Sequence, residues 1–308
     1  MGDIMVSDRS GRFDLLNPRE VASLGGIELV ARGVVEGFLA GLHRSPFRGF
    51  SVEFAEHRPY QPGDELRYLD WKVLGKRDRL YVKQYEEETN LRATIVLDVS
   101  RSMGWTGNPE TTLTKFDYAT RLAASLALIL IRQRDATGLI AYDENVRAVV
   151  PPRSRLGQWP LIVRQLGALE PSGGTAAERA LPRVVDLLKR RGLVVLISDL
   201  LVDRERTLHA MRYLRHRGHQ VAVLHVMDPA EEELAGPAEA RYVDSETGDS
   251  IVASAADLRT AYRTTVAGVV AAWRRACRMS GISYHHITTA TPFGHALRRA
   301  TDARSRAG

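Results

Sequence analysis

From about residue 91 onward, short apolar segments alternate with helix-like segments, and this alternation is the feature that most limits the possible folds. The apolar segments include "RATIVLDVS", "GLVVLISDL" and "HQVAVLHVMD", whose length and β-branched content are typical of strands. Longer segments with helical periodicity lie between them, for example "FDYATRLAASLALILIRQR". Nearly unbroken apolar strands are buried on both faces, as in a parallel sheet between two layers of helices. The sequence therefore predicts an α/β fold with a doubly wound, mostly parallel sheet flanked by helices.

The first 90 residues have a different pattern. A helix is predicted from about 18 to 43, although five glycines within it lower its helix propensity. A polar, aromatic-rich segment follows, and it is too short and too polar to form an independent core, so we expect it to pack on the α/β domain. We predict three parts: the N-terminal helix and polar segment (1–90), the α/β domain (91–289) and a basic C-terminal tail (290–308).

Composition limits the possible classes of protein. A single cysteine, Cys277, excludes an internal disulfide and a thiolate zinc cluster. The longest apolar run, residues 122–131, is too short to cross a bilayer, and the first 20 residues contain no apolar core of signal-peptide length. We therefore expect a cytoplasmic protein with no membrane span. The net charge of +6 comes with arginine clusters at helix ends and no recognisable nucleic-acid-binding module, so nucleic-acid binding is a minor alternative.

Oxygen-bearing side chains follow three predicted strands or loops at the edge where a parallel sheet collects its binding residues. Asp98, Ser100 and Ser102 follow the first strand, Thr175 follows two glycines in "PSGGT", and Asp199 follows the strand "VVLIS". Each residue also has an ordinary structural explanation, because Asp and Ser end strands and Thr caps helices. Their common placement instead favours a shared site.

The chemistry of this site points to a metal ion. Hydroxyl and carboxylate oxygens are hard ligands that suit Mg²⁺ or Mn²⁺. Asp98 and Asp199 would balance the charge directly or through bound water, while the two serines and Thr175 would supply neutral oxygens. An ion with so few direct carboxylates keeps a net positive charge. We therefore expect an Asp or Glu of a partner protein to complete its coordination.

This arrangement resembles the von Willebrand factor A domain. The motif D-x-S-x-S, a later Thr in a glycine-bearing loop and a still later Asp are similar to its metal-ion-dependent adhesion site, and this chain fills all five positions. The resemblance implies a Rossmann-type α/β fold and metal-dependent protein–protein interaction.

The polar N-terminal segment carries a second resemblance, through "EFAEHRPYQPGDELRYLDWK". It is similar to the signature R-x-Y-x-x-G-D-x-x-R-x-[ILV]-D-W of the bacterial family called domain of unknown function 58, which it matches at Arg58, Tyr60, Gly63, Asp64, Arg67, Asp70 and Trp71. The resemblance extends over about residues 20–290, although "GKR" stands where the family usually has Ala-Arg. It implies a partner, a MoxR-type AAA+ ATPase, and a role in the maturation or assembly of a client protein complex. The signature residues would either tie the segment to the sheet domain or bind a partner.

The main alternative is a metal-dependent hydrolase of phosphatase type. Phosphatases of this type have a second Asp two residues after the first, and Ser100 occupies that position here. The sequence contains no nucleophile elbow, Walker A loop, dinucleotide-binding glycine motif or H-E-x-x-H motif. We therefore expect an interaction protein and no enzyme.

Overall fold

The computed structural model describes residues 15–43, 57–59, 81–83, 91–155, 157–173, 177–234, 239–243 and 250–305. The chain divides into two compact units, one formed by residues 1–44 with 91–308 and the other by residues 45–90. The N-terminal helices thus belong to the same unit as the α/β domain. The predicted boundary at residue 90 coincides with the end of the smaller unit, but residues 1–44 group with the sheet domain, because the helices contribute apolar residues to its core.

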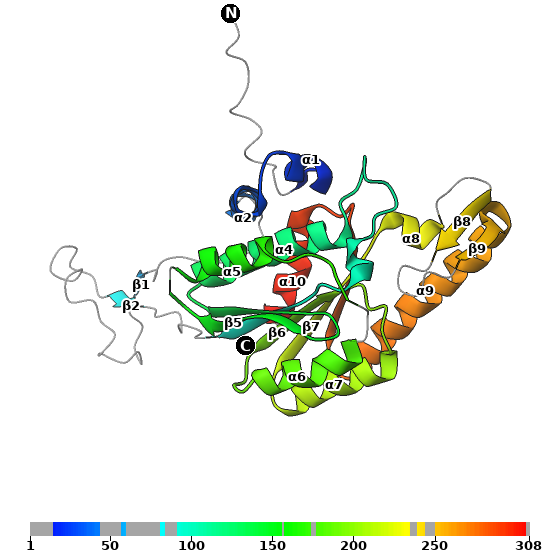
Figure 1. The fold of residues 1–308 in the computed structure, drawn as a ribbon. Helices are drawn as coiled ribbons and strands as arrows, with labels where there is room; N and C mark the ends of the chain where they lie inside the picture. Colours follow the sequence, from blue (N-terminus) through cyan, green and yellow to red (C-terminus); the bar gives the residue numbers. More distant parts are fainter. Residues whose placement is uncertain are drawn as a thin grey trace, which may run out of the picture. The chain divides into compact units, whose positions relative to one another are not determined.

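A six-stranded sheet forms the centre of the larger unit, with the strand order β10-β7-β6-β3-β4-β5 (Figure 1). Every pairing is parallel except that of β5 with β4. The strands are β3 (Arg92–Asp98), β4 (Ala136–Tyr142), β5 (Val146–Arg153), β6 (Leu193–Ser198), β7 (Gln220–Met227) and β10 (Ser283–Thr288). The predicted α/β fold with a mostly parallel sheet is confirmed.

Helices cover both faces of this sheet (Figure 1). Successive residues of β3 face opposite layers, since Ile95 and Leu97 belong to one apolar core and Val96 belongs to the other. The first layer consists of α2 (Ile27–His43), α4 (Lys115–Arg132), α5 (Gln158–Gly167) and α10 (Phe293–Ser305). The second layer consists of α6 (Ala177–Leu187), α7 (Arg204–His216) and α9 (Ala255–Met279).

The predicted N-terminal helix is two helices, α1 (Pro18–Ser23) and α2. They are separated at Leu24 to Gly26, where paired glycines favour a turn over a continuous helix. Helix α2 buries Val30, Val34 and Phe38, which lie four residues apart on one face of the helix. This face packs on α4 and joins the core of the sheet domain.

Residues 293–305 form helix α10 where we expected a basic tail. Phe293, Ala296, Leu297 and Ala300 are all buried, and their spacing places them on one helix face. The ring of Phe293 stacks on Tyr118 of α4 with 4.9 Å between the ring centres. The arginines that suggested a tail alternate with this apolar stripe, so burial of the stripe is what makes the segment a helix.

Two small antiparallel pairs complete the described structure. The first pair joins β8 (Glu239–Val243) to β9 (Ser250–Ser254). In the smaller unit, β1 (His57–Pro59) pairs with β2 (Tyr81–Lys83), and Arg58 lies opposite Val82. The side chain of Arg58 and the other six signature residues lie outside the described residues, namely Tyr60, Gly63, Asp64, Arg67, Asp70 and Trp71.

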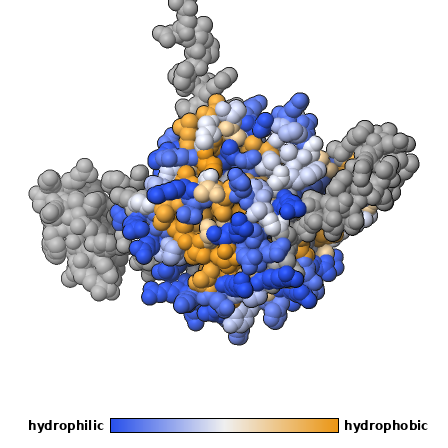
Figure 2. Space-filling view, in the orientation of Figure 1, coloured by the Kyte–Doolittle hydropathy of each residue, from blue (hydrophilic) through white to orange (hydrophobic). Residues whose placement is uncertain are grey.

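The surface of the larger unit is mostly hydrophilic on the face shown in Figure 2, with apolar residues gathered over α1 and α2 and near β5. Leu24, Leu29 and Val149 are among the exposed large apolar residues. In the described part of the chain, every helix is too short or too polar to span a lipid bilayer.

Candidate metal centre

The candidate site lies at the carboxyl edge of the sheet, where the chain changes direction. After β3 the chain forms β4 on one side, and it later returns to form β6 on the other side of β3. Asp98 ends β3 and Asp199 follows β6, so the two carboxylates follow neighbouring strands. This is the position where open α/β sheets bind ligands.

Asp98 is almost fully buried, and its two described partners are neutral. Its Oδ1 accepts a hydrogen bond from the backbone N–H of Ser100 at 2.9 Å, and its Oδ2 accepts one from the Ser198 hydroxyl at 2.6 Å. Burial, together with the negative charge of Asp199, raises the pKa of Asp98 to about 6. A cation beside Asp98 would therefore meet a carboxylate whose charge is weakly compensated.

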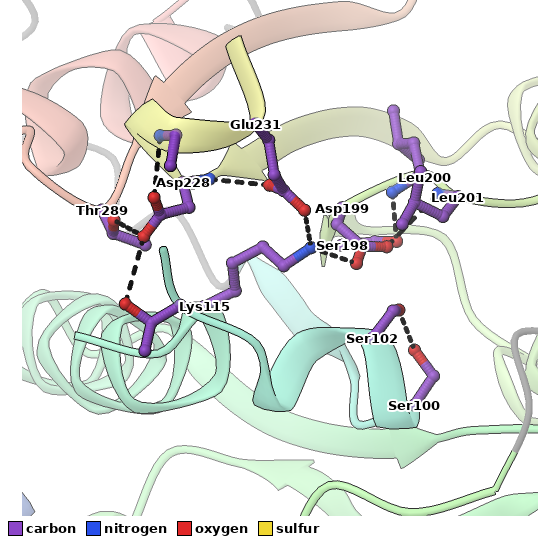
Figure 3. A network of polar contacts seen from close by, with 12 residues as sticks. Ser100, Ser102, Lys115, Ser198, Asp199, Leu200, Leu201, Asp228, Glu231 and Thr289 are labelled. Carbon is purple, nitrogen blue, oxygen red and sulfur yellow. Dashed lines mark hydrogen bonds and ion pairs between the residues drawn. The ribbon is translucent and has the colours of Figure 1, made fainter. Parts of the chain in front are cut away.

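Ser100 and Ser102 place their hydroxyl oxygens 3.2 Å apart, and both residues are buried. Ser100 precedes the short 3₁₀ helix η3 (Arg101–Gly104) in an extended conformation, and Ser102 lies within that helix. Figure 3 shows the two hydroxyls directed at each other. The structure thus brings together the two serines and Asp98.

The glycine loop that contains Thr175 begins beside this serine loop. The N–H of Ser172 donates to the carbonyl of Val99, and the N–H of Arg101 donates to the carbonyl of Gly173. Gly173 has a φ of +70°, a left-handed backbone conformation that glycine adopts readily. Thr175 itself lies outside the described residues.

Asp199 has a cationic partner that the sequence analysis missed. The Lys115 ammonium lies 2.8 Å from Oδ2 of Asp199 and 2.5 Å from Oε1 of Glu231, and the Lys115 side chain is only 1% exposed. Burial opposes protonation of this lysine, but the charges of the two carboxylates outweigh it, so the pKa of Lys115 is raised above its ordinary value. The remaining oxygen of Asp199, Oδ1, accepts from the N–H of Leu201 at 3.2 Å.

The Lys115 contacts extend to the short helix α8 (Pro229–Glu233). Glu231 accepts from the N–H of Asp228 with its second oxygen, which closes a capping box at the start of α8 (Figure 3). Asp228 is buried and accepts from three hydroxyls, those of Thr106, Thr112 and Thr289. These bonds join the loop after η3 to α8 and to the end of β10.

One sequence signal pointed to Lys115. The segment "TKFD" begins with Thr114, whose hydroxyl caps the helix by accepting from Asp117, so Lys115 occupies the first position of α4. A cation at a helix N-terminus is unfavourable because the helix dipole is positive there. A lysine in that position therefore indicates a specific acidic partner elsewhere, although not which one.

Two more buried groups line the same edge of the sheet. Asp143 follows β4 and accepts from Arg147 at 3.1 Å. His225 donates from Nε2 to the carbonyl of Asp199 at 2.8 Å and contacts the Tyr284 hydroxyl through Nδ1 at 2.7 Å. Burial lowers the pKa of His225 to about 4, so this histidine is neutral near pH 7. Among the described contacts, neither Asp143 nor His225 is hydrogen-bonded to the hydroxyl of Ser100 or Ser102.

A hard divalent cation fits part of this arrangement. Asp98, Ser100 and Ser102 offer one carboxylate and two hydroxyls, a donor set that suits Mg²⁺ or Mn²⁺ with water retained. Both oxygens of Asp199 are already engaged, with Lys115 and Leu201. Within the described residues, no cluster of three or more His, Cys, Asp or Glu is arranged to hold a metal, so a site here would depend on hydroxyl oxygens.

Residues 56–271 match the family described as "Protein of unknown function DUF58". The chain belongs to this family. Uncharacterized proteins of Mycobacterium tuberculosis and Mycobacterium bovis are 28% identical over 243 residues, which cover 77% of this chain and 74% of theirs. The family that the sequence resembled is thus confirmed.

Several solved structures are similar to this DUF58 protein. A conserved hypothetical protein BatB from Bacteroides thetaiotaomicron has a TM-score of 0.47 at 18% identity, covering 70% of this chain and 98% of that one. An aerotolerance-related membrane protein from Bacteroides fragilis has a TM-score of 0.48 at 17% identity, covering 71% and 100%. The SpRpn10 VWA domain has a TM-score of 0.40 at 13% identity, covering 69% and 96%.

The DUF58 match includes the signature segment and every candidate site residue. It begins just before Arg58 and continues through Asp98, Lys115 and Asp199 into α9. The N-terminal helices and α10 lie outside the matched range, although both pack on the sheet domain.

Proposed function

We propose that this protein is a metal-dependent adaptor that binds other proteins through a divalent cation at the carboxyl edge of its sheet. Asp98, Ser100 and Ser102 would hold Mg²⁺ or Mn²⁺, with Thr175 and Asp199 as the further predicted members of the site. The observation that carries the proposal is the pair of buried serine hydroxyls, 3.2 Å apart, next to a buried carboxylate whose described hydrogen-bond partners are neutral. A bound ion would supply positive charge to an Asp or Glu of the partner.

Binding suits this site better than catalysis does. General-base chemistry on a serine requires a base within hydrogen-bonding reach of its hydroxyl. The Ser100 hydroxyl contacts the hydroxyl of Ser102 and the carboxylate of Asp98, and the buried His225 is turned toward Asp199 and Tyr284. In the proposed site Asp98 is a metal ligand, so these oxygens support ligand capture better than activation of a serine nucleophile.

Exposed apolar residues next to the site favour a protein ligand. Trp105, directly after η3, is 40% exposed, and Leu201, two residues after Asp199, is 55% exposed. Large apolar side chains beside a polar centre are typical of protein-binding surfaces. A partner that contributes one carboxylate together with apolar side chains would contact both features.

Membership of the DUF58 family supports one class of partner. Members of the family are expected to work with MoxR-type AAA+ ATPases in the maturation or assembly of protein complexes. We propose that such an ATPase, together with a client protein, is the partner of this chain and that its acidic residue binds at the metal site.

The metal component is tested by calorimetric titration of the purified protein with MnCl₂ and with MgCl₂. We expect saturable binding by the wild type and at least tenfold weaker binding by Asp98→Asn and by Ser100→Ala, because each change removes a ligand. Ser154→Ala, which changes an exposed serine after β5, is the matched control and should bind like the wild type. Equal affinity in the wild type and the Asp98 variant would refute the site.

The partner component is tested by co-purification of the tagged protein with a MoxR-type ATPase from its own host. We expect capture in Mg²⁺, loss of capture in EDTA, and loss in the Asp98→Asn variant. If neither EDTA nor the Asp98→Asn substitution reduces capture, docking through the metal is excluded.

A further inference from the structure

Both the backbone N–H and the side-chain ammonium of Lys115 have partners in the candidate metal centre. Its backbone N–H donates to the carbonyl of Trp105 at 3.2 Å, and its ammonium contacts Asp199 and Glu231. The ring of Trp105 lies 6.0 Å from the ammonium. The 1% exposure of the lysine side chain shows that it is shielded from water, although Trp105 is itself partly exposed.

A buried ammonium of this kind requires its carboxylate partners. Removing an ion from water costs several kcal/mol, and close opposite charges with additional hydrogen bonds offset this cost. Asp199 satisfies the requirement on one side, with Oδ2 on the ammonium and Oδ1 on the N–H of Leu201. Glu231 satisfies it on the other side and is in turn bonded to the N–H of Asp228.

We propose that Lys115 holds Asp199 as its counter-ion and so prevents Asp199 from contacting the metal directly. This inference rests on the proposed function. The sequence left open whether Asp199 would balance the charge of the ion directly or through bound water, and the inference assigns it the indirect role. Among the described residues, Asp98 is then the one candidate carboxylate that contacts the ion. With one direct carboxylate, a divalent ion keeps a net positive charge, which strengthens its demand for an acidic group of the partner.

The role of Lys115 predicts an unusual effect of substitution. Removing a cation beside a metal site ordinarily raises metal affinity through the change in charge alone. Here the change also frees Oδ2 of Asp199, so the gain should depend on that carboxylate. Lys115→Met should therefore bind Mn²⁺ about tenfold more tightly than the wild type, and Lys115→Met/Asp199→Asn should lose this gain.

The test is a calorimetric MnCl₂ titration of the wild type, four test variants and one control variant, each checked for folding by circular dichroism. The variants are Lys115→Met, Asp199→Asn, the double variant and Asp98→Asn. Lys189→Met is the matched control, because it removes an exposed lysine that precedes β6 at the opposite edge of the sheet. We expect Asp199→Asn to weaken binding by less than about threefold, Asp98→Asn by at least about tenfold, and Lys189→Met not to change it.

Each result decides the inference. Loss of binding in Asp199→Asn as large as in Asp98→Asn would overturn it, and this comparison remains decisive if Lys115→Met fails to fold. An unchanged or lowered affinity in a folded Lys115→Met protein would also overturn it. A wild type that binds no Mn²⁺ would refute the proposed function. If Lys115→Met then gains Mn²⁺ binding, the role of Lys115 is still supported. If Lys115→Met also binds no Mn²⁺, the role of Lys115 is overturned.

Discussion

The carboxylates buried at the carboxyl edge of the sheet differ in how their charges are compensated. Asp199 and Asp143 each contact a cationic side chain, and Asp228 accepts from three hydroxyls and a backbone N–H. Asp98 has two neutral donors and a neighbouring negative charge, which together with burial raises its pKa to about 6. This difference identifies Asp98 as the residue with most to gain from a metal ion.

His219 should make the stability of the protein depend on pH. The histidine is buried before β7, its Nε2 donates to the carbonyl of Leu188 at 3.2 Å, and its Nδ1 has no hydrogen-bond partner in the described structure. Burial lowers the pKa of His219 below its ordinary value of 6.5, so the ring stays neutral to a lower pH in the folded protein than in the unfolded chain. The unfolded chain binds the extra proton as the pH falls below 6.5, and the free energy of unfolding then decreases by at most about 1.4 kcal/mol per pH unit.

Urea unfolding at pH 7.5 and pH 5.5 measures this effect. The wild type should lose more stability between the two pH values than His219→Gln does. His295→Gln changes an exposed histidine of α10 and should lose as much as the wild type. An equal loss in the wild type and His219→Gln would contradict the assignment.

Helix α4 is the element that connects the core to the candidate site. Its long apolar face packs on the sheet, α2, α5 and α10, and its first residue is Lys115. The Thr114 hydroxyl caps this end of the helix. Elements that pack on α4 therefore help to hold the ammonium in place.

Phe293 tests the contribution of α10. Phe293→Ala should lower the free energy of unfolding by about 3–5 kcal/mol, because it removes a fully buried ring that stacks on Tyr118. Arg298→Ala, an exposed change on the same helix, should shift stability by less than about 0.5 kcal/mol. Similar denaturation midpoints for the two variants would show that α10 is not part of the cooperative core.

At the scale of the whole molecule, the carboxyl edge of the sheet combines buried charge with an exposed apolar rim. Leu200 has a φ of 54°, and its side chain is buried while Leu201 is exposed. A non-glycine residue in this left-handed region is strained, and such strain gathers at functional sites. The turn directly after Asp199 thus places an apolar side chain at the surface beside the site.

Leu201 separates partner binding from metal binding. Leu201→Ala should weaken association with the proposed ATPase partner by about tenfold through lost apolar contact, while the proposed Mn²⁺ binding stays within about twofold of the wild type. Leu187→Ala is the matched control, since this leucine is 44% exposed at the end of α6, before β6 begins. Biolayer interferometry measures the affinity of each variant for the partner. Equal affinities for Leu201→Ala and Leu187→Ala would exclude Leu201 from the interface.

Much of the fold followed from local pattern in the sequence. The strands β3, β6 and β7 were evident as short apolar segments, and the helices between them were evident from periodicity. Because parallel strands end at a common edge, their order along the chain also predicted that Asp98 and Asp199 follow strands at that edge. The break between α1 and α2 was missed, although the paired glycines Gly25 and Gly26 mark it. The helix α10 was missed because its arginines obscured a buried face that depends on contact with α4.

The sequence by itself determined the α/β class, the edge of the sheet at which the candidate site lies and the oxygen-rich character of that candidate site. The tertiary structure alone decided how the charges there are compensated. Lys115 meets Asp199 and Glu231 across 84 and 116 residues of chain. No local periodicity encodes such pairs, because they form only when β6, α4 and α8 pack together and exclude water from the ammonium.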